Sequence, residues 1–264
     1  MKYRIGLLFF VSVLSTAGEF SPVDPPVEGC PGNFFTQKAR VFDIVTICAT
    51  SLVPKDKLKH AANVAAQWLD NDQNGQIDEP SLIAPLRSNH ATLLMSKSGF
   101  NDKAFETFEP YLDPMIGQDL SADETTPVLG RDASQEEIHH LIVNAGWQPY
   151  LPSVFSDKKA KQSELYQQWL IAEKKGLYSY DDTTCDDACK TIEFFYLATA
   201  AYLGSGADLE SDEMRVKNRE ELKSSLPDLA LLMESNRYHY PIHIWPDGNY
   251  RYSENITLTS VKDD

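Results

Sequence analysis

The stretch KDKLKHAANVAAQWLDNDQNGQIDEPS, residues 55–81, joins a helical pattern to a loop rich in acidic side chains. Its apolar residues recur at the spacing of one helix face and predict an amphipathic helix: Leu58, Ala61, Ala62, Ala65, Trp68 and Leu69. Upstream, RVFDIVTICAT is apolar and β-branched, so residues 40–50 predict a buried strand. Downstream, ATLLM at residues 91–95 predicts a second strand. The first half of the chain therefore combines a helix with a small sheet.

The second half is mostly helical in its pattern. Helices are expected at about residues 134–145, 157–175, 186–203 and 218–235, whereas residues 99–133 hold turn signals that predict a surface wrap. YPIHIWPDGNYRY, residues 240–252, predicts a hairpin that turns at Pro246–Asn249. We expect a predominantly helical, single α+β domain over residues 34–252, with a small sheet and a C-terminal β-hairpin. A Pro/Gly-rich lead-in (18–33) and a polar tail (253–264) flank it.

Residues 1–17 have the pattern of a secretory signal peptide, with a basic start, a short apolar run and small residues before the expected cleavage after Ala17. No later apolar stretch is long enough to predict a membrane span, so the protein is expected to be secreted and extracellular. The chain carries a formal charge of −15, and removal of Lys2 and Arg4 leaves 22 basic and 39 acidic residues. This balance argues against nucleic acid and anionic membranes. It favours calcium, mineral, matrix components or basic proteins as partners, although many acidic secreted proteins are simply soluble.

Four cysteines follow the signal peptide, and an even number in an exported chain predicts two disulfides. We expect Cys30–Cys48 and Cys185–Cys189, because the second pair is separated by one helical turn. A Cys-x3-Cys zinc site is the alternative for that pair. Asn255-Ile256-Thr257 is a glycosylation sequon in the polar tail.

The loop DNDQNGQIDEPS, residues 70–81, resembles the calcium loop of an EF-hand. Such a loop places oxygen ligands at positions 1, 3, 5, 7 and 9 and a glycine at position 6. The corresponding residues here are Asp70, Asp72, Asn74, Gln76 (through its backbone carbonyl), Asp78 and Gly75. The resemblance implies a Ca²⁺ site.

Two features depart from the EF-hand pattern. Ser81 stands where the bidentate glutamate belongs, and Pro80 and Pro85 disfavour a long exit helix. Affinity is therefore expected in the weak range of extracellular modules, about 10⁻⁴–10⁻³ M, unless Glu79 replaces the missing ligand. An Asx-rich turn without calcium uses the same residue types and is the alternative.

EEIHH, residues 136–140, differs by one residue from the zinc-binding motif His-Glu-x-x-His. On a helix, Glu136 and His140 lie one turn apart, opposite the apolar face that carries Ile138, Leu141 and Ile142. The segment resembles the active-site helix of zincin metallopeptidases. For the gluzincins among them, the resemblance implies a third metal ligand on a later helix, here Glu193, with Glu137 as general base.

Two carboxylates and one imidazole would suit Mn²⁺, Fe²⁺ or Ca²⁺ more than Zn²⁺. A reading without metal fits the same residues. Ser134 and Glu137 form a capping-box pattern, Glu136 and His140 could pair on the surface, and Lys190 could pair with Glu193.

HAANVAAQWLDND, EEIHHLI and YDDTTCDDACKTIEFFY together resemble a family of uncharacterised exported proteins in which these segments occur together. That resemblance implies no particular activity. The sequence has no serine-hydrolase elbow, phosphate loop or dinucleotide fingerprint.

The leading expectation is a secreted acidic calcium-binding protein, of an extracellular or calcified matrix. The alternative is a metal-dependent hydrolase, active or degenerate, that uses the EEIHH helix and Glu193. A third reading is an interaction protein in which neither site functions.

Overall fold

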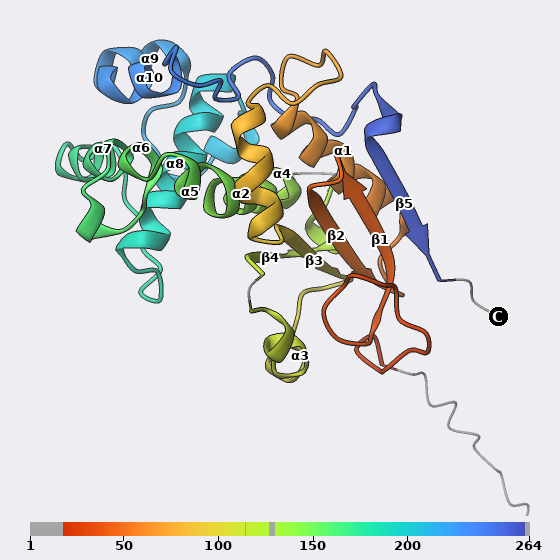
Figure 1. Cartoon of the computed structure of the whole chain (residues 1–264). Helices are drawn as coiled ribbons and strands as arrows, with labels where there is room; N and C mark the ends of the chain where they lie inside the picture. Colours follow the sequence, from red (N-terminus) through yellow and green to blue (C-terminus); the bar gives the residue numbers. More distant parts are fainter. Residues whose placement is uncertain (1–17, 114, 127–129, 262–264) are drawn as a thin grey trace, which may run out of the picture.

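A mixed sheet of five strands forms one side of the protein in the computed structural model, which describes residues 18–113, 115–126 and 130–261 (Figure 1). The predicted signal peptide lies outside the described residues. The strand order is β4-β3-β2-β1-β5. β1 pairs antiparallel with β2 and β5, whereas β2–β3 and β3–β4 are parallel. The strands are β1 Phe35–Val41, β2 Val45–Thr50, β3 Thr92–Ser96, β4 Gly117–Ser121 and β5 Ile256–Ser260.

The single strand predicted at residues 40–50 is wrong, because the chain reverses inside it. Val41 pairs with Val45 across a tight turn in which Phe42 and Asp43 have positive φ angles of 49° and 58°. This left-handed pair matches the twist of a hairpin. The turn has none of the usual glycine or Asn-Gly signal, so the apolar run conceals it. The second predicted strand is confirmed as β3.

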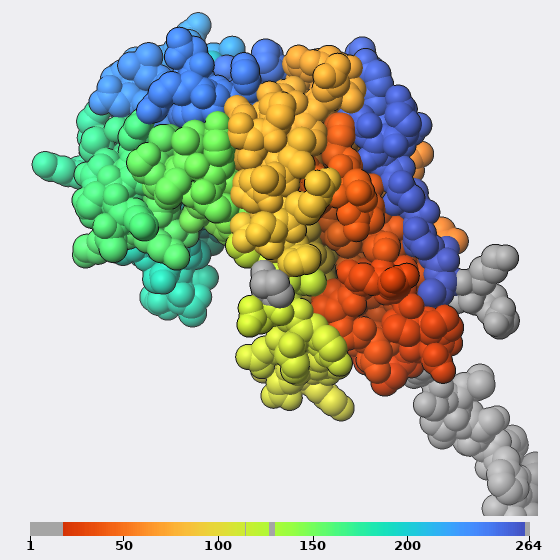
Figure 2. Space-filling view, in the orientation of Figure 1, coloured from red at the N-terminus to blue at the C-terminus, as the bar shows by residue number. Residues whose placement is uncertain are grey.

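Helix α1, Lys55–Leu69, forms as predicted and contacts β1, β2 and α4 (Ala133–Ile142). It buries the expected face, including Leu58 and Trp68. The segment expected to wrap the surface holds α3 (Asp102–Phe108) and β4. Figure 2 shows α3 in yellow-green, projecting from the body and separated by a notch from the cyan-green helices.

The helices of the second half gather on the side away from β5 (Figure 1). Two predicted helices have different bounds. The helix expected at 157–175 begins only after its N-cap Ser163, and the helix expected at 218–235 is broken before Pro227, which cannot continue the backbone ladder. The helices are α2 Ile83–Ser88, α5 Gln148–Tyr150, α6 Pro152–Phe155, α7 Glu164–Lys174, α8 Asp187–Leu203, α9 Arg219–Ser225 and α10 Pro227–Met233.

Residues 240–252 contain no strand, so the predicted hairpin is wrong. Side chains of α1 and the acidic loop satisfy this backbone instead. Asn71 Oδ1 accepts from the backbone N–H groups of His243 (2.7 Å) and Ile244 (3.1 Å), and Gln67 Oε1 accepts from that of Gly248 (2.8 Å). Because these groups are already paired, no ladder is needed. The chain then enters the sheet as β5, inside the predicted polar tail, so the α+β fold has one C-terminal strand.

Both expected disulfides are present, with Cα atoms 5.8 Å apart for Cys30–Cys48 and 5.3 Å apart for Cys185–Cys189. The second bridge excludes the alternative Cys-x3-Cys zinc site. Within the described ranges, no helix combines the length and apolar character that crossing a membrane requires.

Candidate metal centres

Glu136 and His140 on α4 meet Glu193 on α8, where the two helices pack together. One ligand atom of each residue lies within 4.8 Å of the others. His140 Nε2 is 3.8 Å from Glu193 Oε2. The structure therefore brings the predicted ligand set together from residues that are far apart in the sequence.

This cluster lies inside the protein. Glu136 and His140 are each 5% exposed, and Glu193 is partly buried. His140 Nε2 is buried and has no hydrogen-bond partner among the described residues. A buried nitrogen without a partner costs free energy, and a bound cation would remove that cost.

Burial sets the protonation of the cluster. Burial and the neighbouring Glu136 carboxylate together raise the pKa of Glu193 to about 9. Burial lowers the pKa of His140 to about 3, with Arg131 as the second cause. Without a cation, this site holds a protonated carboxyl and a neutral imidazole at neutral pH. Neutral imidazole is the form that binds metals.

Arg131, just before α4, forms an ion pair with Oε2 of Glu136. Its Nε also lies 3.9 Å from Oδ1 of the buried Asp208. Burial raises the pKa of Glu136, but the guanidinium opposes this effect. Arg131 thus favours the ionised form of one candidate ligand, a role that no sequence motif indicated.

Glu137, the residue in the general-base position, is held by the sheet. Its Oε2 accepts from Gln118 Nε2 of β4 at 2.7 Å and lies 3.9 Å from His140 Nδ1. Burial, reinforced by Glu136, raises the pKa of Glu137 to about 8. A base with a pKa near neutrality is suited to proton transfer.

A cavity of about 240 Å³ opens beside these residues; we call it the α8 cavity. Its wall includes two of the candidate metal ligands, His140 and Glu193, so a small ligand in it would lie next to them. The lining residues are Gln118, His140, Asn144, Asp157, Ala188, Cys189, Ile192 and Glu193.

The structure contradicts the three interpretations of these residues that involved no metal. The N-cap of α4 is Asp132, which accepts from Ser134 N at 3.1 Å, so the predicted Ser134 capping box is wrong. Asp132 also pairs with His60 at 2.6 Å, an interaction that the sequence did not indicate. Glu136 and His140 are buried rather than paired on the surface. Glu193 lies beside His140, and no salt bridge joins it to Lys190 among the described residues.

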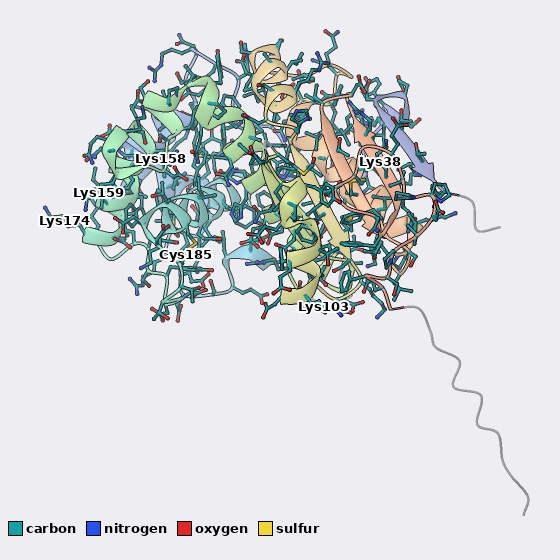
Figure 3. The ribbon with its side chains drawn as sticks, turned by 60° about the horizontal axis from the view of Figure 1, so that its bottom comes forward. Lys38, Lys103, Lys158, Lys159, Lys174 and Cys185 are labelled. Atoms are coloured by element: carbon teal, nitrogen blue, oxygen red, sulfur yellow. A yellow bond between two sulfur atoms is a disulfide. The ribbon has the colours of Figure 1, made fainter. Side chains whose placement is uncertain are left out.

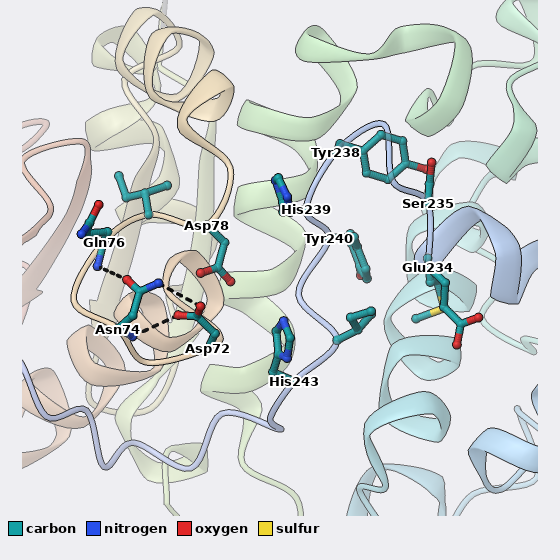
Figure 4. Close-up of a pocket in the computed structure, with 13 residues that line it drawn as sticks. Asp72, Asn74, Gln76, Asp78, Glu234, Ser235, Tyr238, His239, Tyr240 and His243 are labelled. Atoms are coloured by element: carbon teal, nitrogen blue, oxygen red, sulfur yellow. Dashed lines mark hydrogen bonds between the residues drawn. The ribbon is translucent and has the colours of Figure 1, made fainter.

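The acidic loop forms the second cluster, in which carboxylate oxygens of Asp70, Asp72 and Asp78 lie within 4.8 Å of one another. Gly75 has a φ of 91°, the left-handed conformation that the sharp turn requires. Figure 4 shows Asp72, Asn74 and Asp78 along one side of a cavity of about 300 Å³, which Gln76 also lines. The structure thus places these predicted calcium ligands around one turn.

Two of the loop carboxylates are in contrasting environments. Asp70 is fully buried and accepts from Asn74 N (2.9 Å), Gly75 N (2.8 Å) and Tyr250 Oη (2.6 Å). Asp78 Oδ1 has no partner among the described residues. Burial raises the pKa of Asp78 to about 6; the backbone N–H of Asn71 opposes this effect, and Asp72 adds to it. A divalent cation would offset the clustered negative charge.

Glu79 does not replace the missing twelfth ligand. Its carboxylate accepts from the backbone N–H groups of Ser81 and His239, each at 3.1 Å, and thereby caps a short 3-10 helix. The sequon nitrogen is also engaged, since Asn255 Nδ2 donates to Gly75 O (3.0 Å) and Tyr250 Oη (2.9 Å). The atom that would carry a glycan instead joins β5 to the acidic loop.

No family model, curated protein or solved structure matches the chain. Functional inference therefore rests on the two clusters and the cavities beside them.

Proposed function

We propose that the protein is a metal-dependent hydrolase whose ion is held by Glu136, His140 and Glu193. The observation that carries this proposal is the buried Nε2 of His140, which has no hydrogen-bond partner among residues 18–113, 115–126 and 130–261. It lies 3.8 Å from Glu193 Oε2 in a cluster with Glu136. Two carboxylates and one imidazole give a mixed oxygen and nitrogen donor set. Such a set suits Mn²⁺ or Fe²⁺ as well as Zn²⁺.

The ion would supply Lewis acidity and a water molecule of lowered pKa. Glu137 would serve as the proton acceptor, and Gln118, which lines the α8 cavity, would hold the Glu137 carboxylate in place. Arg131 would keep Glu136 ionised and aligned through its ion pair. The α8 cavity supports a catalytic rather than a purely structural site, because structural metal sites are closed by protein ligands and catalytic ones keep an open position.

The test combines metal analysis with hydrolysis. Protein purified from a secreting host without chelator is analysed for bound metals and incubated with a peptide mixture that is followed by mass spectrometry. We expect one equivalent of a transition metal and new peptide termini. Glu137→Gln should keep the metal and lose the cleavage, whereas Lys190→Gln, a control on α8 outside the metal cluster and the cavity wall, should keep both. Absence of a transition metal from the wild-type protein would refute the proposal.

We further propose that the acidic loop binds Ca²⁺ through Asp70, Asp72, Asn74, Gln76 and Asp78. The convergence of three carboxylates on one turn favours this second function. In this proposal the protein is a secreted acidic calcium-binding protein of an extracellular or calcified matrix, with matrix components, mineral or basic proteins as partners. Calorimetric titration with CaCl₂ tests it: Asp72→Ala should abolish the binding heat, and equal heats for both proteins would contradict it.

The two proposals are compatible, because a hydrogen bond connects the end of α1, which leads into the calcium loop, to the start of α4. Trp68 Nε1, at the end of α1, donates to Gln135 O at 2.9 Å. Gln135 Nε2 in turn donates to Pro246 O at 2.5 Å. Gln135 directly precedes Glu136, so calcium in the loop would stabilise the surroundings of the proposed catalytic ligands.

A further inference from the structure

A third cavity, of about 140 Å³, lies between α3 and the edge strand β4; we call it the α3 cavity. Its walls are mainly apolar, with Leu94, Phe105, Phe108 and Leu112, and the β4 residues Gly117, Gln118 and Asp119 complete them. Phe105 leaves 39% of its surface exposed, whereas Phe108 is fully buried. An apolar cavity of about 150 Å³ can hold a benzene ring, so this one has the size and chemistry for an aromatic or branched side chain.

The α3 cavity and the α8 cavity meet at one residue of the edge strand β4, on opposite faces of the sheet. Gln118 lines the α3 cavity and the α8 cavity, and it also donates to Glu137. Figure 3 shows Lys103 of α3 and Cys185, just before α8, on the same face of the protein. A ligand that crosses the edge strand β4 at Gln118 can therefore place one group beside His140, on one face of the sheet, and another against the phenylalanines, on the other face.

The two cavities differ in polarity. Asn144, Asp157 and Glu193 line the α8 cavity, so an apolar side chain gains little there. In the α3 cavity the same side chain would leave water and cover the exposed ring of Phe105, which is favourable. The site therefore has a polar compartment for the reacting group and an apolar compartment for a neighbouring one.

We infer that the α3 cavity is the specificity pocket of the enzyme, and that it selects substrates with an aromatic or branched apolar side chain beside the cleaved bond. This inference rests on the proposed hydrolase function. It names Phe105, Phe108 and Leu112 as specificity-determining residues that are remote from the metal ligands.

The test uses two variants and a matched control. Leu112→Trp fills the pocket and Phe105→Ala removes part of its wall, whereas Tyr111→Ser alters a neighbouring residue that is 58% exposed and does not line the cavity. Each protein is checked for folding by circular dichroism and for metal content. Hexapeptides that differ only in Phe, Ala or Asp at one position are then compared by kcat/KM. The same peptides are also labelled with fluorescein, and their binding is measured by fluorescence anisotropy. The proteins in this assay are Glu137→Gln and the double variants that carry Glu137→Gln together with each of the three substitutions.

We expect the wild-type and Tyr111→Ser proteins to prefer Phe over Ala by about 10- to 200-fold, the range for apolar pockets. Leu112→Trp and Phe105→Ala should lose most of that preference in both assays while keeping their metal. Cleavage without preference for Phe, or a preference unchanged in both variants, would overturn the inference and leave the hydrolase standing. A metal-free wild-type protein that neither cleaves nor binds any of the peptides would overturn both.

Discussion

The thermal stability of His139→Gln should still depend on bound metal, whereas that of His140→Ala should not, although the two histidines are adjacent and both buried. His140 Nε2 has no hydrogen-bond partner within the described part of the chain and lies beside Glu193. His139 Nε2 instead forms a 2.8 Å hydrogen bond with Tyr240 Oη, which is itself 2.7 Å from Thr199 Oγ1. The first should therefore bind the ion, and the second should stabilise the core.

The expected changes in stability follow from these interactions. An ion present at about 1,000 times its dissociation constant stabilises the native state by about 4 kcal/mol. Loss of that ion in His140→Ala should lower the melting temperature by about 8–16 °C for a domain of this size. Breaking the His139–Tyr240 hydrogen bond should cost about 1–3 kcal/mol, whether or not metal is bound.

The assay is thermal unfolding in buffer with constant calcium, with and without a chelator of transition metals. The chelator should lower the melting temperature of wild type and of His139→Gln but leave that of His140→Ala unchanged. The reasoning would be refuted if the chelator had the same effect on His140→Ala as on wild type. It would also be refuted if the chelator had no effect on either protein.

Three further predictions concern the base, the loop and the start of α4. Glu137→Gln should retain the transition metal and reduce kcat by about 10²- to 10⁴-fold, and unchanged turnover of a cleaved peptide would exclude Glu137 as base. Asp72→Ala should lose calcium-dependent thermal stabilisation, whereas the exposed-helix control Glu106→Gln should keep it; equal stabilisation would contradict the loop assignment. Burial alone would raise the pKa of Asp132, but hydrogen bonds from His60 and Ser134 hold it below the ordinary 3.8. The carboxylate therefore stabilises the fold above about pH 4 and loses this effect as the pH falls through its lower native pKa. Asp132→Ala should cost about 0.5–2 kcal/mol at pH 7 and less at pH 3 in urea unfolding, and a cost independent of pH would contradict this assignment.

Periodicity predicted the elements that carry one clear face. The apolar stripe of α1 and the apolar run of β3 gave correct elements, because each packs in the way that its pattern implies. The β1–β2 turn at Phe42 and Asp43 could not be recognised, since two apolar strands joined without glycine look like one. The hairpin at 240–252 failed because Asn71 and Gln67, remote in sequence, satisfy its backbone.

The candidate sites show the same limit. One-turn spacing was enough to place Glu136 beside His140, and an acid in an apolar helix was enough to single out Glu193. Arg131 and Gln118 were missed because their importance depends on tertiary contacts, with Glu136 and Glu137 respectively. Asp132 was passed over as N-cap in favour of Ser134, since both residue types can cap a helix and only the structure shows which one does.

The most direct test of the central claim is elemental mass spectrometry of the wild-type protein and of Glu136→Gln and Glu193→Gln, all purified from secreting cells without chelator. We predict one equivalent of zinc, manganese or iron in the wild type, beside calcium, and its loss from both variants with calcium retained. A wild-type protein that contains calcium alone would contradict the claim and leave the α4–α8 cluster as a buried pair of carboxyl groups.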